Sequence, residues 1–117
     1  MDRVRPSSLD RKAAIRAYKE RPTERGVFSF RCVPTGELWV GGSRDLYASR
    51  NSLPFTLRLG RHRERTLQAA WNRHDESAFR FEVLQVLDED TPALVLPEEL
   101  KRASGEWATK LGARALP

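Results

Sequence analysis

Residues typical of β-strands cluster in two short stretches near the start of the chain: Val27, Phe28, Phe30, Val33, Trp39 and Val40. Pro34-Thr35-Gly36 lies between these stretches, and it is a turn sequence because proline presets φ and glycine adopts conformations that other residues resist. The pattern predicts a hairpin with strands over residues 26–33 and 37–42. A hairpin alone buries too little apolar surface to be stable in water, so other elements must cover it.

A second alternating stretch predicts a third strand over residues 79–86. Phe79, Phe81 and Val83 alternate there with Arg80 and Glu82. A repeat of two residues is the signature of a strand that buries one face and exposes the other.

Three further segments repeat apolar residues at helical spacing, and their inward positions are Leu46, Leu53, Leu57, Leu67, Ala70, Trp71, Leu100, Ala103, Trp107 and Leu111. Pro54 predicts a kink or break near Arg50–Leu53, because proline removes an internal hydrogen bond. The second helix is expected to end near His74. The third opens at Pro97 and closes at Gly112, which are favoured residues for those ends.

The first 24 residues form a separate segment in this interpretation. Ser7-Ser8-Leu9-Asp10 is a helix start and Pro22 stops the run, which predicts an N-terminal helical extension over residues 1–24. A domain over residues 25–117 follows. Its expected core consists of Phe28, Trp39, Leu46, Leu57, Leu67, Trp71, Phe81, Val83 and Trp107.

The net charge of +5 is unevenly distributed along the chain. Residues 1–25 carry +4, residues 26–74 carry +5 and residues 75–117 carry −4. Only four of the 21 basic residues are lysine, and the planar guanidinium of arginine suits phosphate oxygens. This bias favours a nucleic-acid partner, but a GC-rich genome produces the same bias, so both explanations stay open at this point.

Several classes of protein do not fit the 117-residue chain. No apolar run reaches the roughly 20 residues that span a bilayer, and the N-terminus lacks an apolar signal segment. No membrane partner and a cytoplasmic location are therefore expected. Cys32 is the one cysteine, so an internal disulfide is impossible.

Gly26-Val27-Phe28 and Trp39-Val40-Gly41, ten residues apart, resemble the paired tripeptides of the GIY-YIG nucleases. Residues 42–46, 59–62, 67–72 and 79–84 resemble the continuation of that family in the same order, and the resemblance covers roughly residues 25–112. It implies an α+β fold with a small three-stranded antiparallel sheet flanked by helices. The N-terminal helix would be an addition to that fold.

The resemblance also implies a chemistry, the hydrolysis of a DNA phosphodiester with one divalent ion, Mg²⁺ or Mn²⁺. The family uses tyrosine hydroxyls from both tripeptides, an arginine on the first helix and a metal-binding glutamate on a later helix. Phe28 and Trp39 replace the two tyrosines, and neither side chain can accept a proton. The arginine falls near Ser49 by direct counting, and the glutamate falls at Ser104.

Neighbouring residues are candidate substitutes for these missing groups. Arg50, one residue beyond the counted position, is the candidate phosphate-binding arginine of the site, with Arg44 as the alternative. His62 lies where some family members have a functional histidine, and it or Tyr47 is the candidate proton acceptor. An exposed loop histidine and a surface or packing tyrosine are the plain alternatives. The candidate metal ligand is Glu106, and the other available carboxylates are Glu99 and Glu82.

The predicted function is that of a GIY-YIG-type domain acting on DNA, with altered catalytic residues and weak or lost cleavage. A non-catalytic nucleic-acid-binding domain of the same fold is the alternative, and a protein-interaction domain is a third hypothesis. DNA is the expected partner, RNA is the second candidate and the oligomeric state is open. The predicted nucleic-acid contacts, besides Arg50 and His62, are Arg44, Arg58, Arg61, Arg63 and Arg65.

Overall fold

The computed structural model describes residues 23–117. Its elements, in chain order, are β1 (Gly26–Cys32), β2 (Leu38–Ser43), α2 (Leu46–Arg58), α3 (Arg65–Arg73), a 3₁₀ turn (Glu76–Ala78), β3 (Phe79–Val86), α4 (Leu96–Leu111) and β4 (Arg114–Ala115). The three strands and three helices predicted for the domain are all present. The predicted N-terminal helix lies outside the described residues, and the domain boundary at residue 25 stays a prediction.

The four strands form one sheet in the order β3-β1-β2-β4. β1 pairs antiparallel with both β2 and β3, which confirms the predicted antiparallel core of the sheet. β4 adds a fourth strand, parallel to β2, and makes the sheet mixed. This strand has only two residues, too few for any periodic pattern to indicate it.

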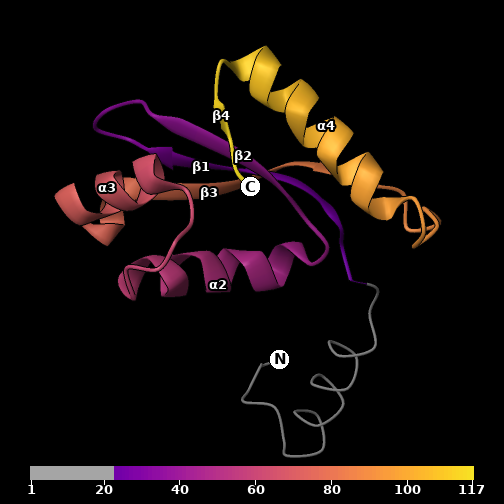
Figure 1. Cartoon of the computed structure of the whole chain (residues 1–117), viewed down its shortest axis with the longest axis horizontal. Coiled ribbons are helices and arrows are strands. Elements are labelled where there is room, and N and C mark those ends of the chain that lie inside the picture. The colour runs from indigo at the N-terminus through magenta and orange to yellow at the C-terminus, as the bar shows by residue number, and fades with distance from the viewer. Residues whose placement is uncertain (1–22) are drawn as a thin grey trace, which may run out of the picture.

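Helices cover both faces of the sheet, as Figure 1 shows, with α4 on one face and α2 and α3 on the other. Side chains of β1 alternate between the two faces, and six of its seven residues are buried. Phe28 and Phe30 belong to the cluster under α2 and α3, while Val27 packs with α4. β1 is therefore the central strand on which both helical layers depend.

The predicted core is largely confirmed, and its buried members are Phe28, Trp39, Leu46, Leu57, Leu67 and Trp71. Phe81 and Trp107 are partly buried and pack at the edges of the two clusters. Val83 was wrongly placed in the core, because 47% of its surface is exposed on β3, the edge strand of the sheet. Leu111 was also wrongly placed, since it lies exposed in the last turn of α4.

Of the kink or break predicted near Arg50–Leu53, the break is wrong, because α2 is continuous from Leu46 to Arg58 with Pro54 inside it. The kink stays a prediction. Leu53 and Leu57, on either side of the proline, are both buried, and their packing compensates for the lost hydrogen bond. The side chain of Asp45 caps the helix by accepting a hydrogen bond from Ala48 N at 3.0 Å. No helix within residues 23–117 is long and apolar enough to cross a membrane.

The two tripeptide glycines allow close approaches that a side chain would prevent. A Cβ on Gly26 would overlap the carbonyl oxygen of Gln85 on β3. A Cβ on Gly41 would lie 3.0 Å from the ring of Phe28 and 3.3 Å from Leu116 Cβ. Both glycines therefore serve the packing of the sheet and of what lies upon it.

Candidate nucleic-acid interface

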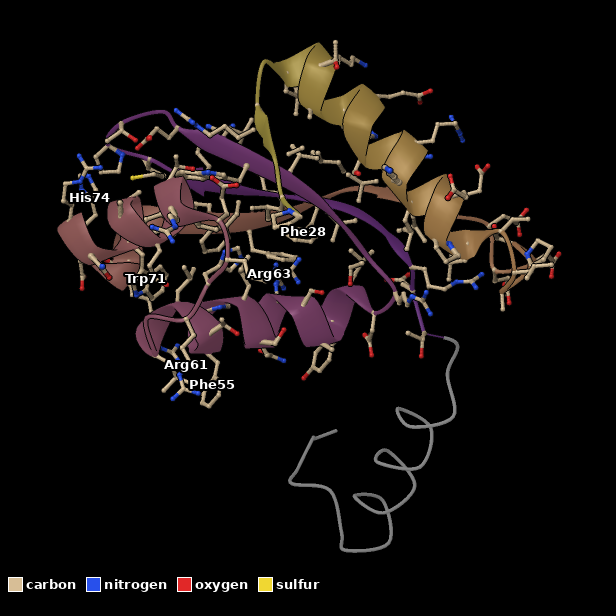
Figure 2. The ribbon with its side chains drawn as sticks, in the orientation of Figure 1. Phe28, Phe55, Arg61, Arg63, Trp71 and His74 are labelled. Carbon is tan, nitrogen blue, oxygen red and sulfur yellow. The ribbon has the colours of Figure 1, made fainter. Side chains whose placement is uncertain are left out.

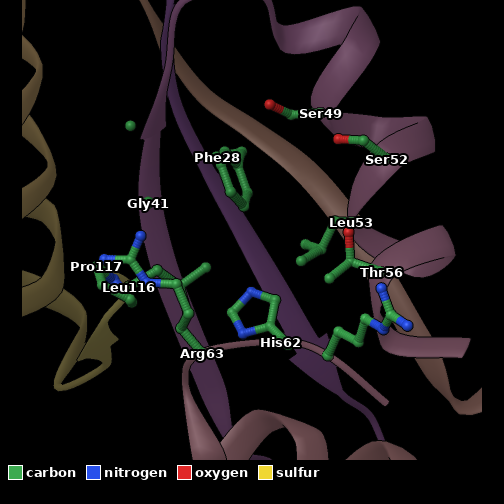
Figure 3. A pocket seen from close by; sticks show the side chains of 12 residues that line it. Phe28, Gly41, Ser49, Ser52, Leu53, Thr56, His62, Arg63, Leu116 and Pro117 are labelled. Carbon is green, nitrogen blue, oxygen red and sulfur yellow. The ribbon is translucent and has the colours of Figure 1, made fainter. Parts of the chain in front are cut away.

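A pocket of about 290 Å³ opens between α2, the loop before α3 and the β2–β4 side of the sheet. We call it the central pocket, and the described residues that line it are Phe28, Gly41, Gly42, Ser49, Ser52, Leu53, Thr56, Arg61, His62, Arg63, Leu116 and Pro117. In Figure 3 the rings of Phe28 and His62 lie between the hydroxyls of α2 and the Leu116–Pro117 segment. Aromatic, hydroxyl and cationic groups thus meet in one hollow.

The loop that carries His62 is held by hydrogen bonds from three directions. Gly60, with φ of +70°, ends α2 and turns the chain, and Arg61 N then donates to Thr56 O. His62 N donates to the side-chain oxygen of Gln68 at 3.0 Å, and the amide nitrogen of Gln68 donates to Leu57 O at 3.0 Å. These bonds fix the histidine backbone against both helices.

The His62 ring is oriented by its own backbone. Its Nδ1 accepts a hydrogen bond from Glu64 N at 2.9 Å, so in the neutral ring the proton lies on Nε2. Burial lowers the pKa of His62 below its usual value, while the nearby charge of Glu64 opposes this and that of Arg63 adds to it. The ring is therefore neutral at pH 7 and has Nε2–H as its remaining hydrogen-bonding group, which is a donor and not an acceptor.

Arg50 lies near the central pocket and is linked to it by two stacked aromatic rings. The Phe28 and Phe81 rings stack with centroids 4.8 Å apart, and the Arg50 guanidinium lies 5.5 Å from the Phe81 centroid. A cation over an aromatic face is attracted by the ring quadrupole. The stack places Arg50 on the same face of the sheet as the central pocket, although Arg50 does not line the pocket itself.

Trp39, the first residue of the second tripeptide, lies away from the central pocket. It is fully buried, and its Nε1 donates to Thr66 Oγ1 at 3.0 Å. Thr66 Oγ1 in turn donates to Glu64, the residue that caps α3. The indole therefore anchors the start of α3 to the sheet, and only Phe28 of the two tyrosine replacements lines the pocket.

The predicted DNA-binding arginines separate into paired and unpaired groups. Arg61, Arg63 and Arg65 form no ion pair with any residue of the described chain. In Figure 2 Arg63 lies between α2 and the sheet, near Phe28, whereas Arg61 lies at the C-terminal end of α2. Arg65 lines a neighbouring groove that shares Arg61 and His62.

Two of the predicted arginines are not part of this group. Arg58 is bound by the Glu76 carboxylate through two hydrogen bonds of 2.9 and 2.7 Å, and this pairing raises the pKa of Arg58. Arg44 is exposed between β2 and α2 and does not line the central pocket. Tyr47, a candidate proton acceptor, is exposed on the first turn of α2 and likewise is not a lining residue.

The candidate metal ligands do not join His62 and Arg50. Glu106 and Glu99 lie on α4, on the opposite face of the sheet, and both pair with Arg102 at 2.9 and 2.7 Å. Glu82 is exposed on β3. Residues 23–117 contain no group of three or more His, Cys, Asp or Glu that could hold a metal ion. The residues at the central pocket therefore do not fit the divalent ion that the fold family implies.

Sequence reasoning missed three hydroxyl side chains that α2 directs into the central pocket. Ser49, Ser52 and Thr56 follow one another at intervals of three and four residues, which places them on one helix face. The Ser49 hydroxyl also hydrogen-bonds the Ser43 hydroxyl at 2.6 Å, which links α2 to β2. Their helical spacing is a signal that a search for hydroxyls, rather than for titratable groups, would have found.

No family model matches the chain, and no curated protein matches it. Among solved structures it resembles the catalytic domain of the intron endonuclease I-TevI in a mutant form, with a TM-score of 0.67, 17% identity and coverage of 77% of this chain and 86% of that one. It also resembles the catalytic domain of the homing endonuclease I-TevI, with a TM-score of 0.63, 16% identity and coverage of 80% and 98%. That domain is a GIY-YIG nuclease, so the likeness confirms what the paired tripeptides predicted: this chain has the GIY-YIG fold.

Proposed function

We propose that this chain binds the backbone of DNA in the central pocket and cleaves it slowly or not at all. The observation that carries the proposal is the set of donors around the Phe28 ring, where Arg61, His62 and Arg63 face three hydroxyls of α2. Of the described residues that line the pocket, none is Asp or Glu. A hollow with many donors and no acidic side chain suits an anion with several acceptor oxygens, such as a phosphodiester.

The state of the arginines supports binding further. Arg61 and Arg63 are exposed, and no described carboxylate neutralises them, so a phosphate meets their full charge. The neutral His62 ring adds an Nε2–H donor without adding charge. The resemblance of the fold to endonuclease catalytic domains favours DNA over other polyanions, with RNA as the second candidate.

The same residues argue against fast hydrolysis. A base must accept a proton from water, but Phe28 has no hydroxyl and Trp39 is buried away from the pocket. His62 already uses Nδ1 to accept the Glu64 N–H, so it offers a donor where a base is needed. Because the described residues contain no cluster of carboxylates that could hold a metal ion, we assign no metal-dependent step to this pocket.

The test of binding compares two arginines of equal charge. Arg63→Ala is expected to weaken binding of a labelled duplex and to reduce the slope of log affinity against log salt by about 1, because one phosphate contact is lost. Arg58→Ala is the matched control, since Glu76 already neutralises that guanidinium. Fluorescence titration of a DNA duplex, a DNA single strand and an RNA single strand at two salt concentrations measures both quantities.

Equal losses in the two variants would refute the pocket as the binding site. Absence of binding by the wild type, even at low salt, would refute the function and leave the protein-interaction hypothesis. Tighter binding of RNA than of DNA would replace the proposed partner while keeping the site.

The test of cleavage uses supercoiled plasmid and branched DNA with magnesium or manganese. We expect little or no nicking by the wild type under conditions where it binds DNA. Metal-dependent nicking that both Arg50→Ala and His62→Ala abolish would instead indicate an altered but working nuclease. Equal nicking by all three proteins would point to a contaminant or to a different site.

A further inference from the structure

The outer edge of β3 carries outward-facing backbone groups and opposite charges that are complementary to the same edge of a second copy of this chain. β3 is the last strand on its side of the sheet and pairs only with β1. Its central residues, from Phe79 to Val83, keep one regular register with β1, and the register shifts beyond Val83. The edge therefore offers one straight run of five residues, counted from 79 to 83.

The backbone groups on this edge follow from the alternation of hydrogen bonds in an antiparallel sheet. Cys32 N donates to Glu37 O on the β2 side, and Val33 N donates to Ala78 O on the β3 side. Since bonding directions alternate along a strand, Arg80 and Glu82 face β1, and Phe81 and Val83 direct their N–H and C=O groups outward. Within the described residues, no backbone group bonds Phe81 or Val83 on that side.

The side chains on the same edge are exposed and opposite in charge. Arg80 and Glu82 lie on one face of the strand, and Val83, on the other face, is 47% exposed. Arg80 donates to Ser77 O and Phe79 O, while the Glu82 side chain has no partner among the described residues. The outward carbonyl of Phe79 is thus covered only by the adjacent guanidinium, which a neighbouring strand can replace.

From these features we propose that two copies of this chain pair through their β3 edges, antiparallel, about a two-fold axis at Phe81. In that register Arg80 of each copy lies opposite Glu82 of the other, at the closer, non-hydrogen-bonded positions. Phe79 lies opposite Val83, and the two Phe81 residues exchange backbone hydrogen bonds. An axis at Glu82 or Arg80 would instead bring two like charges together, so the charges select one register.

The sign of the charges distinguishes this edge from a protected one. Proteins commonly prevent edge pairing with charged side chains, and two like charges at positions 80 and 82 would repel a second copy. Arg80 and Glu82 are opposite in sign and two residues apart, so antiparallel self-pairing makes them attract. A two-fold axis perpendicular to the sheet also keeps α2 and α3 of both copies on the same side, and both central pockets then face one way.

The experiment is a charge exchange monitored by sedimentation velocity over a range of concentrations. Wild type is expected to shift from monomer to dimer as concentration rises. Arg80→Glu alone and Glu82→Arg alone each turn two attractive pairs into two repulsive pairs, and each is expected to weaken dimerisation roughly tenfold. The double exchange, Arg80→Glu with Glu82→Arg, restores opposite charges and is expected to restore the dimer.

A control and a second measurement keep the outcome clear. Glu89→Arg changes net charge as much as Glu82→Arg, but it lies in the loop after β3 and is expected to leave dimerisation unchanged. Hydrogen exchange should slow at the amides of Phe81 and Val83 as concentration rises. A monomer at every concentration, or a double exchange that fails to recover while remaining folded, would overturn the proposal. None of these results depends on DNA binding.

Discussion

The two faces of the sheet differ in the size of their buried side chains and in how their charges are arranged. Under α2 and α3 the core is aromatic, with the rings of Phe30, Trp71 and Phe79 packed together at centroid distances of 5.1 to 6.4 Å. Under α4 it consists of small residues, among them Val40 and Ala103. The buried side chains of the two faces therefore differ in size.

The charges follow the same division. On α4 the half-buried Glu99 and the exposed Glu106 both pair with Arg102, so two carboxylates already meet the charge of this guanidinium. Beside the central pocket, the side chains of Arg61 and Arg63 form no ion pair with a described residue. Exposed pairs of the first kind contribute little to stability, whereas unpaired arginines remain available to an anionic ligand. The two faces thus differ in whether their arginines are already paired with carboxylates.

The largest expected difference between the two faces is in the cost of removing a tryptophan ring. Trp71→Ala is expected to lower the free energy of unfolding by about 3–5 kcal/mol, because it leaves a cavity against Phe30 and Phe79. Urea unfolding followed by circular dichroism measures the loss. Trp107→Ala, on the α4 face, removes a ring that is only partly buried and should cost clearly less. Equal losses would show that the two faces do not differ in this respect.

Adding one methyl group at Gly26 or at Gly105 should have opposite effects on stability, because Gly26 is closely packed and Gly105 is not. Gly26→Ala is expected to destabilise the fold by about 1–3 kcal/mol, because its Cβ would overlap the Gln85 carbonyl and force β1 and β3 apart. Gly105→Ala adds the same methyl group to α4, where nothing lies within 4 Å of it. That change should stabilise the protein by about 0.5–1 kcal/mol, since alanine favours helix. Thermal unfolding should show a lower melting temperature for Gly26→Ala and a higher one for Gly105→Ala than for the wild type.

The smallest expected effect is a dependence of stability on pH that comes from His62. Because burial lowers its pKa in the folded state, the unfolded chain takes up a proton first as the pH falls through about 6.5. Stability from this group is therefore complete above that pH and declines as the pH falls through the lower, folded pKa. His62→Asn keeps an acceptor for Glu64 N but cannot titrate. Urea unfolding at several pH values should show a flatter decline for the variant, and identical declines would contradict the assignment.

The sequence was sufficient for three of the four strands and for the three helices because their signals were local. Alternation at residues 79–83 and turn chemistry at Pro34-Thr35-Gly36 identify strands whatever lies around them. Val83 was misplaced because alternation shows which side chains share a face, but not whether a helix covers that end of the strand. The break predicted at Pro54 was wrong because the hydrogen bond that proline removes can be inferred from the sequence, whereas the burial of Leu53 and Leu57 depends on the tertiary fold.

The site was less accessible to the same reasoning. Helical spacing gives the angle of Glu106 about its own axis but not which face of the sheet α4 covers, so its separation from His62 could not be foreseen. The role of Trp39 depends on Thr66, 27 residues away, through a hydrogen bond that no local pattern shows. His62 and the flanking arginines were found because a short charged loop brings them together within three consecutive residues.

The position of β4 near the end of the described chain affects when the central pocket forms. Leu116 N donates to Val40 O at 2.8 Å, and this bond places Leu116 against Gly41 as one wall of the central pocket. During synthesis that wall cannot exist until the chain beyond α4 has left the ribosome, long after β2 has emerged. Contacts between distant segments also carry the largest loop-closure cost and form late in folding. The pocket proposed to bind nucleic acid is therefore completed last, because its β4 wall is added only after β1, β2, β3 and the helices.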